Sequence, residues 1–164
     1  MSSLRIDFNL LDLISTNLIK RGVNLSVAES CTGGFLSTFL TAKSGSSNFF
    51  NGSVISYSNQ SKINFLDITA EEINNYGVVS KFVVEKMATN VMIKFGTNYG
   101  LATTGYVELS SAKSPINNYY LHSWICIASE ANIISKSITF NKTRLENISI
   151  VSYELLNLFV KEIV

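Results

Sequence analysis

Apolar residues recur along the chain in two alternating patterns. Leu11, Ile14 and Leu18 lie three or four residues apart, and this spacing predicts an amphipathic helix over residues 7–20 that ends at Gly22. The next segment, NLSVAES, is short and apolar in its middle, and a glycine pair and a second helical pattern, FLSTFLTAK, follow it. The chain is therefore predicted to begin with a helix, a strand, a turn and a helix.

Short apolar runs and helical segments continue to alternate through the middle of the chain. Residues 44–51 predict a loop, GSVISYS predicts a buried strand, and a helical segment begins at Asn59. Ser80 is placed to cap a long helix, and the YGLATTG run that comes later predicts a strand ending on glycine. Strands that are joined by crossover helices are expected to be parallel.

The last third of the chain changes this arrangement. The runs YYLHSWICIASE and ANIISKSITF are separated by a short connection and predict a β-hairpin. Thr69 with Glu72 and Thr143 with Glu146 match the capping-box pattern, so helices are expected to follow Thr69 and Thr143. Together the patterns predict an α/β sandwich whose mixed sheet combines early parallel strands with a closing antiparallel hairpin.

Composition favours a single folded domain over residues 1–164. Apolar residues make up 46% of the chain and charged residues 15%, below the roughly 25% of ordinary soluble domains. A weakly charged surface of this kind favours self-association, so we expect a homo-oligomer. The net charge is only +1, and the lysines and arginines are scattered along the chain. A nucleic-acid-binding protein is expected to gather them in a basic patch, so we expect no nucleic-acid partner.

The apolar segments, the two cysteines and the single histidine limit the cellular location of the protein and the chemistry of its site. No segment holds about 18 consecutive apolar residues, so we expect a cytoplasmic protein without a membrane partner. Cys31 and Cys126 are too far apart in sequence to form a zinc-ligand motif, and both are expected to be reduced thiols. His122 is the only histidine and is expected to be structural rather than a metal ligand.

Polar residues follow three of the predicted strands. They form the segments Glu29–Gly34, Tyr57–Asn59 with Lys62 shortly after it, and Thr103–Gly105. Ligands of open α/β sheets bind at the carboxyl ends of the strands, where loops meet helix N-termini. A hydroxyl such as that of Ser30 could act there as a nucleophile, and Lys62 could activate it if burial lowered the lysine pKa.

Each of these residues also has a structural interpretation. The SCTGG turn could be a helix cap, Cys31 a nucleophile or a packing residue, Lys62 a solvated surface charge, and Tyr57 an anchor for a strand end. The residues alone therefore indicate a site without fixing its reaction.

The four segments SVAESCTGG, VISYSNQSKINFL, YGVVS and LATTG resemble, in order and spacing, the C-terminal domain of the competence/damage-inducible protein CinA. The resemblance is clear from about Val23 to Gly105 and weaker beyond. Stand-alone members of this family are nicotinamide mononucleotide deamidases. The resemblance implies a three-layer α/β/α sandwich on a mixed, mostly parallel sheet.

The resemblance also implies an activity in pyridine nucleotide recycling. Water would hydrolyse the carboxamide of nicotinamide mononucleotide to nicotinate mononucleotide and ammonia, with no metal or other cofactor. Ser30 would attack the amide carbon, Lys62 would be its base, and Tyr57 would relay or hold the proton. The residues implied to contact the substrate are Thr32, Gly33 and Gly34 as backbone donors, and Ser47, Thr104 and Gly105 as the nucleotide lining.

The chain departs from the family pattern after Gly105. The family continues with a loop of the type Ile-Ala-Gly-Pro-x-Gly-Gly, whereas this chain reads YVELSSAKSP, with Glu108 where bare backbone is expected. A carboxylate beside a phosphate is unfavourable unless it points away. Ser149 also stands near the place of an expected arginine.

Three hypotheses are compatible with this mixture. The chain is an active deamidase of nicotinamide mononucleotide in which Lys113 or Arg144 replaces the lost phosphate contacts. Alternatively, it is a paralogue that uses the same serine and lysine on another small amide. The third hypothesis is a catalytically silent nucleotide-binding protein.

Overall fold

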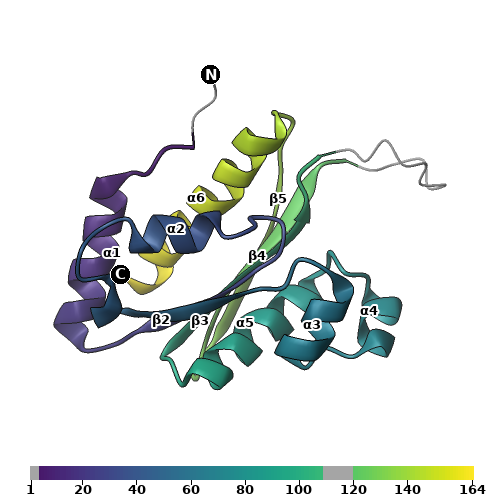
Figure 1. Cartoon of the computed structure of the whole chain (residues 1–164), viewed down its shortest axis with the longest axis horizontal. Coiled ribbons are helices and arrows are strands. Elements are labelled where there is room, and N and C mark those ends of the chain that lie inside the picture. Colours follow the sequence, from purple (N-terminus) through teal and green to yellow (C-terminus); the bar gives the residue numbers. More distant parts are fainter. Residues whose placement is uncertain (1–3, 109–119) are drawn as a thin grey trace.

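The computed structural model describes residues 4–108 and 120–164. Five strands form one sheet, and helices cover both of its faces (Figure 1). The strands are β1 (Leu25–Glu29), β2 (Phe50–Ile55), β3 (Tyr99–Tyr106), β4 (His122–Ser129) and β5 (Ile133–Thr139). The helices are α1 (Phe8–Arg21), α2 (Phe35–Thr41), the 3₁₀ turn η1 (Ser46–Asn48), α3 (Asn59–Leu66), α4 (Ala70–Tyr76), α5 (Lys81–Phe95) and α6 (Arg144–Ile163).

The strand order is β2-β1-β3-β4-β5. Strand β1 pairs in parallel with β2 and with β3, whereas β4 is antiparallel to both β3 and β5. Four strands consequently run in one direction and β4 runs in the other. This arrangement confirms the mixed, mostly parallel sheet and the closing hairpin.

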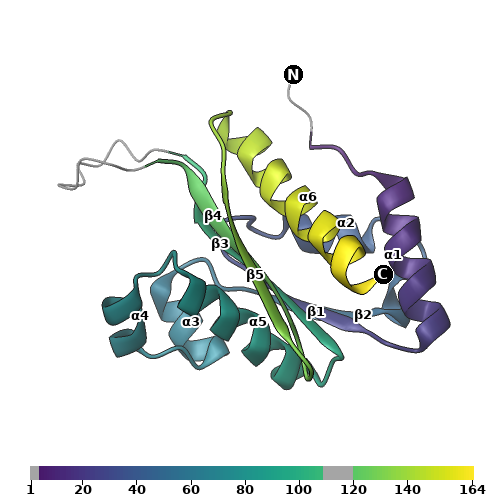
Figure 2. The same ribbon diagram turned by 180° about the vertical axis from the view of Figure 1, so that it is seen from behind.

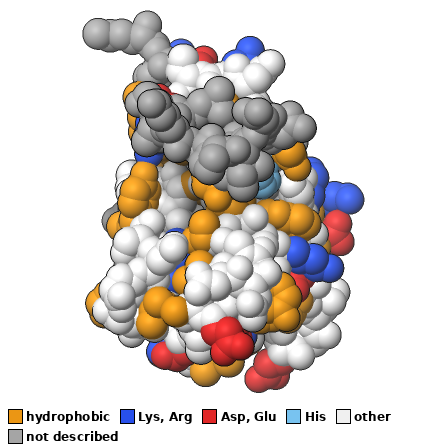
Figure 3. Space-filling model, turned by 90° about the vertical axis from the view of Figure 1, so that its right-hand side faces the viewer, with side chains coloured by type: hydrophobic (Ala, Val, Ile, Leu, Met, Phe, Trp, Pro, Cys, Tyr) orange, Lys and Arg blue, Asp and Glu red, His pale blue; other side chains and the backbone are white. Residues whose placement is uncertain are grey.

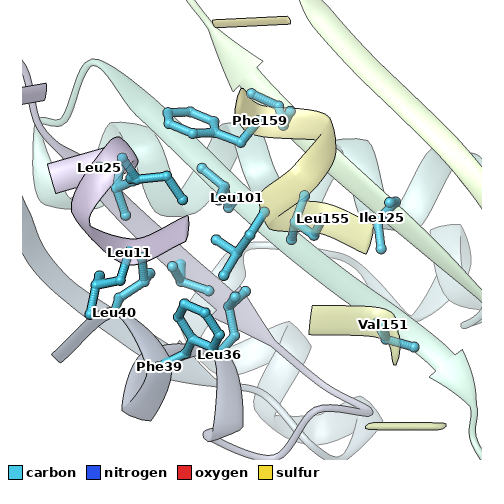
Figure 4. Close-up of a cluster of buried hydrophobic side chains, with 14 of the residues drawn as sticks. Leu11, Leu25, Leu36, Phe39, Leu40, Leu101, Ile125, Val151, Leu155 and Phe159 are labelled. Carbon is cyan, nitrogen blue, oxygen red and sulfur yellow. The ribbon is translucent and has the colours of Figure 1, made fainter. Parts of the chain in front are cut away.

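Two apolar cores make this a three-layer α/β/α sandwich. Helices α1, α2 and α6 pack on one face, and α3, α4 and α5 pack on the other, as Figures 1 and 2 show from opposite sides. In Figure 4 the side chains of Phe39, Leu101 and Leu155, from α2, β3 and α6, converge in the first core. Neighbouring residues of a strand face opposite cores, so Leu101 belongs to the first core and Ala102 to the second.

The helix boundaries follow the capping signals in the sequence. Thr69 and Glu72 form a reciprocal capping box at α4, and Thr143 and Glu146 form another at α6, as predicted. Ser80 caps α5 through a bond from the Val83 N–H. Within the described ranges, no helix has both the length and the hydropathy needed to cross a bilayer.

The prediction of a buried strand at GSVISYS is wrong in two respects. Strand β2 begins earlier, at Phe50, inside the segment predicted to be a loop, and it ends at Ile55. It is also an edge strand with only β1 beside it, so its residues are partly exposed. The apolar run could not show this, because strand order depends on pairing with distant segments.

Candidate active site

The segment that follows β1 makes a tight turn into α2. Gly33 and Gly34 have φ angles of 57° and 99°, in the left-handed region that favours glycine. The Gly33 N–H donates to the Ser30 carbonyl at 3.1 Å. Ser30 therefore lies at the carboxyl edge of the sheet, between the ends of β2 and β3.

The buried carboxylate of Glu29 holds this turn in place through hydrogen bonds. Glu29 is fully buried and accepts hydrogen bonds from the Thr32 hydroxyl, the Gly34, Leu36 and Ser37 N–H groups and the Ser37 hydroxyl, at 2.5–3.1 Å. Gly34, the residue at the N-cap position of α2, has no side chain with which to cap the helix. Glu29 replaces that cap and fixes the residue next to it, Ser30.

The role of Glu29 was not anticipated from the sequence. The available signal was a carboxylate at the end of an apolar strand, followed within a few residues by two glycines and a helix. Such a carboxylate suits the unsatisfied N–H groups of the helix start.

Lys62 contacts the same turn at Ser30. Its side chain extends from the first turns of α3, and the residue is only 1% exposed. Its Nζ donates to the Ser30 hydroxyl oxygen at 2.9 Å and to the Ser56 carbonyl at 2.7 Å. The Ser56 N–H donates to the Glu29 carbonyl at 2.7 Å, which ties the end of β2 to β1. The alternative of Lys62 as a surface charge is wrong, because the residue is buried beneath the sheet edge.

Burial shifts the pKa values of Lys62 and Cys31 in opposite directions. Desolvation lowers the pKa of Lys62 from 10.5 to about 8, because the buried ammonium loses its hydration. Desolvation raises the pKa of Cys31 to about 11, and its Sγ lies 3.5 Å from the Ser123 hydroxyl. At neutral pH Cys31 is therefore a protonated thiol, which makes it a poor nucleophile compared with a serine that contacts a lysine.

Ser30 and Lys62 lie in a pocket of about 240 Å³ at the carboxyl edge of the sheet. The lining residues are Ser30, Cys31, Tyr57, Asn59, Lys62, Val78, Val79, Thr104, Gly105, Tyr106, Val107, Glu108 and Arg144. Figure 3 views the side of the molecule on which α3 and α4 lie in Figure 1, where hydrophobic side chains are scattered over the surface and charged side chains are dispersed. The pocket brings together Ser30, Tyr57, Lys62, Thr104 and Gly105, to which the resemblance gives roles, and Arg144, which was suggested as a replacement for a lost phosphate contact.

Thr104 and Gly105 shape the pocket wall. The Thr104 hydroxyl donates to the Val78 carbonyl at 2.9 Å and so joins β3 to the segment before α5. A Cβ atom on Gly105 would lie 2.7 Å from the Ser123 Cβ on the paired strand β4. Glycine is therefore needed there by close packing within the sheet.

Tyr57, Glu108 and Arg144 form the rim of the pocket. Tyr57 is 58% exposed, and its hydroxyl accepts a bond of 2.6 Å from Arg144 Nη2. Arg144 Nη1 donates to the Glu108 carboxylate at 3.4 Å. Among the described residues, the Tyr57 hydroxyl makes no hydrogen bond to Ser30 or Lys62. Ser56 turns inward at the end of β2 while Tyr57 turns outward, so the relay position expected for Tyr57 is not formed here.

Two of the three expected backbone donors, those of Gly33 and Gly34, have structural roles in the turn instead. Thr32, Gly33 and Gly34 line a neighbouring groove of about 810 Å³ rather than the pocket. The Gly33 N–H is bonded to Ser30 and the Gly34 N–H to Glu29, so neither is available as a donor. Within the described part of the chain, the N–H groups of Cys31 and Thr32 make no hydrogen bond to a backbone carbonyl.

Ser47 is not brought to the pocket. It lies in η1, which precedes β2, whereas Ser30 follows β1. Because β1 and β2 are parallel, these positions lie at opposite edges of the sheet. Lys113, the other cation suggested for phosphate binding, falls outside the described residues.

His122 is in β4, where its ring lies against the rings of Tyr106 and Tyr120. It is not among the described residues that line the pocket. Over residues 4–108 and 120–164, no group of three or more His, Cys, Asp or Glu side chains is arranged to hold a metal ion.

Solved structures of similar fold come from several bacteria. The competence/damage inducible protein CihA of Agrobacterium tumefaciens is 25% identical with a TM-score of 0.86, and the match covers 98% of each chain. The competence damage-inducible protein A of Klebsiella pneumoniae is 24% identical with a TM-score of 0.86, covering 96% of this chain and 97% of that one.

Sequence comparison agrees with the fold. A CinA-like protein of Flavobacterium psychrophilum is 38% identical over 146 residues, which are 89% of this chain and 34% of the relative. A putative competence-damage inducible protein of Alkaliphilus oremlandii is 32% identical over 145 residues, 87% of this chain and 35% of the relative. The chain thus spans about a third of the length of these relatives. A family model described as the CinA C-terminal domain matches residues 7–163, and the chain therefore belongs to the CinA C-terminal domain family.

Proposed function

We propose that this chain is an amidohydrolase that converts nicotinamide mononucleotide and water to nicotinate mononucleotide and ammonia. The observation that carries the proposal is the 2.9 Å contact between the buried Lys62 Nζ and the Ser30 hydroxyl. A serine hydroxyl is a weak nucleophile until a base takes its proton, and a lysine can be that base when its pKa is lowered. The resemblance to nicotinamide mononucleotide deamidases supports the choice of substrate.

The lowered pKa of Lys62 matters because only the neutral amine can accept a proton. With a pKa of about 8, a minor but useful fraction of Lys62 is neutral at pH 7. In that form the Ser30 O–H donates to Nζ, which reverses the direction of the hydrogen bond seen with the ammonium. The Ser56 carbonyl holds Nζ in place in both forms.

The first half of the reaction forms an ester with the enzyme. Ser30 Oγ attacks the carboxamide carbon while its proton passes to Lys62 Nζ. The tetrahedral intermediate collapses by breaking the C–N bond, and Lys62 returns the proton to the departing nitrogen, which leaves as ammonia. The acyl group of the nicotinate remains on Ser30.

The second half releases the acid. Water attacks the ester carbon and gives one proton to Lys62, and the Ser30 oxygen then leaves and takes that proton back. The product is the carboxylic acid form of nicotinate mononucleotide, which loses a proton to the solvent and becomes the carboxylate. The residues return to their starting state, and no other reactant is consumed.

The negative oxygen of both intermediates needs hydrogen-bond donors. The N–H groups of Cys31 and Thr32 follow the nucleophile directly, and no backbone carbonyl among the described residues accepts a bond from them. A donor that follows the nucleophile in a strand-to-helix turn is a common oxyanion contact. Arg144 is the described residue that would approach the phosphate at the rim.

Ammonia release from nicotinamide mononucleotide tests the proposal. The purified chain should release ammonia and nicotinate mononucleotide in equal amounts, and Ser30→Ala should abolish the release. Ser44→Ala is the matched control, because Ser44 is an exposed serine in the loop after α2. It should retain full activity.

Two results would contradict the proposal. Equal release by the native chain and Ser30→Ala would exclude Ser30 as the nucleophile. A rise in melting temperature with nicotinamide mononucleotide, but without ammonia, would identify a silent binding protein, since a ligand stabilises the native state whether or not it reacts.

A further inference from the structure

The charges of the pocket are unevenly placed. Among the described lining residues, the cations are Lys62 and Arg144, and the carboxylate is Glu108. Lys62 is at the floor, where its Nζ is committed to Ser30 and Ser56. Arg144 is therefore the cation at the rim that an anionic part of a substrate would meet.

Both terminal guanidinium nitrogens of Arg144 already donate hydrogen bonds. Nη2 donates to the Tyr57 hydroxyl at 2.6 Å, and Nη1 donates to Glu108 at 3.4 Å. Arginine binds phosphate best with two parallel N–H donors. A phosphate would have to displace Glu108 from Nη1 or bind beside its negative charge.

The backbone holds Glu108 in this position. The residue before it, Val107, is buried, and its carbonyl accepts a bond of 2.9 Å from the Asn147 side chain. Asn147 is itself buried in the first turn of α6, and its amide also donates to the Lys142 carbonyl at 2.8 Å. The same helix start carries Arg144, so this network sets the two charged residues side by side.

We infer that Glu108 is a specificity-determining residue that occupies Arg144 and weakens the preference of the pocket for a phosphorylated substrate over the same compound without its phosphate. The pocket then also accepts a nicotinamide amide without a phosphate, represented by nicotinamide riboside, whose ring is cationic and whose ribose carries hydroxyls. This inference rests on the proposed amidase activity and extends its substrate class.

The expected effect is moderate because the rim is exposed. The side chain of Glu108 is 59% exposed and that of Arg144 is 40% exposed. Solvent and salt screen charges at such sites, so removal of the carboxylate should change selectivity by about fivefold to tenfold.

The test compares kcat/KM for nicotinamide mononucleotide and for nicotinamide riboside. The native chain should release ammonia from both compounds. Glu108→Gln should raise the ratio of mononucleotide to riboside by about fivefold to tenfold at low salt. Glu130→Gln is the control, since Glu130 is an exposed carboxylate in the β4–β5 turn at the opposite edge of the sheet, and it should leave the ratio unchanged.

The role of Arg144 is tested in the same assay. In an Arg144→Gln background, Glu108→Gln should have a much smaller effect, because the two residues act as a pair. An undiminished effect there would overturn the role assigned to Arg144. A ratio that Glu108→Gln leaves unchanged, or a native chain that strongly prefers the mononucleotide, would overturn the inference as a whole.

Binding distinguishes a failure of this inference from a failure of the amidase proposal. The affinities of the inactive Ser30→Ala variant for the two compounds can be measured by calorimetry, with and without Glu108→Gln. If neither compound releases ammonia but the affinity ratio shifts as expected, the effect of Glu108 on the choice of ligand holds and the amidase proposal fails. If ammonia is released but neither ratio shifts, the inference fails and the amidase proposal stands.

Discussion

Ser30 and Lys62, at the floor of the pocket, are almost fully buried, whereas Tyr57 and Arg144, at its rim, are more than a third exposed. The floor residues are held by hydrogen bonds that cross β1, β2 and α3. The rim residues are joined by one hydroxyl and one exposed ion pair. Several elements of the fold therefore maintain the geometry of the floor. A substitution of a single side chain can change the geometry of the rim.

The energies of the two regions differ in the same direction. A buried amine or carboxylate that loses its partner costs several kcal/mol, so roughly 3 kcal/mol or more opposes change at the floor. An exposed ion pair contributes about 0–1 kcal/mol. Substitutions at the rim are therefore expected to have little effect on folding, and the chain departs from the family pattern beside the rim, after Gly105.

The largest expected effect is the loss of catalysis in Lys62→Met. Methionine preserves much of the side-chain volume but cannot accept a proton, so kcat should fall on the order of a thousandfold. The fold should persist, because a buried charge and its desolvation penalty are removed. Ammonia release and thermal unfolding measure the two effects.

The control for Lys62→Met is Lys81→Met. The Lys81 side chain is 64% exposed at the start of α5 and lies outside the pocket, so its substitution should leave turnover unchanged. Activity of Lys62→Met close to that of the native chain would show that another group is the base.

The next largest effect is a loss of stability in Glu29→Gln. An amide NH₂ cannot accept hydrogen bonds, so some of the donors that surround Glu29 would be left facing another donor. The free energy of unfolding should fall by about 2–4 kcal/mol. Denaturant unfolding would measure it.

Glu72→Gln is the matched control for Glu29→Gln. Glu72 also caps a helix through its carboxylate, but at the surface, where water can replace a lost partner. Its loss of stability should be much smaller. Equal losses in the two variants would contradict the view that the burial of Glu29 gives it its importance.

A smaller, graded effect is the dependence of activity on pH. Folding lowers the Lys62 pKa to about 8, so the neutral, active base increases as pH rises. Below that pKa, kcat/KM should increase about tenfold per pH unit, and above it kcat/KM should level off. A profile that is flat from about pH 6.5 to 9.5 would be incompatible with Lys62 as the base.

The smallest expected effect belongs to Tyr57→Phe. The substitution removes the hydroxyl that accepts from Arg144 but retains the ring. We expect kcat to change by less than about tenfold, as is usual for loss of one exposed hydrogen bond outside the proton-transfer pair. A loss as large as that of Lys62→Met would instead support the proton relay that the resemblance implies for Tyr57. Steady-state kinetics decides between the two roles.

The pocket floor could be predicted from the sequence more readily than its rim. The apolar pattern predicts the strand before Ser30 and the presence, though not the bounds, of the strand before Lys62. Parallel strands bring their carboxyl ends to one edge. Glu108 and Arg144 are 36 residues apart in the chain, and their contact depends on the way Asn147 holds the end of β3 against α6. Ser47 is the opposite case, a residue that was expected at the site but that the fold keeps away from it. The parallel pairing of β1 and β2 places Ser47 at the other end of the strands.

The sequence by itself determined the helices, most of the strands and the mixed sheet, because capping residues and apolar periodicity act over a few neighbouring positions. It also determined which polar residues stand at strand ends. Only the tertiary structure decided that β2 is an edge strand, that Glu29 caps α2 and that Lys62 is buried against Ser30. Burial and strand order depend on contacts between segments that are distant in the chain, and the lowered pKa of Lys62 exists only once those contacts exclude water.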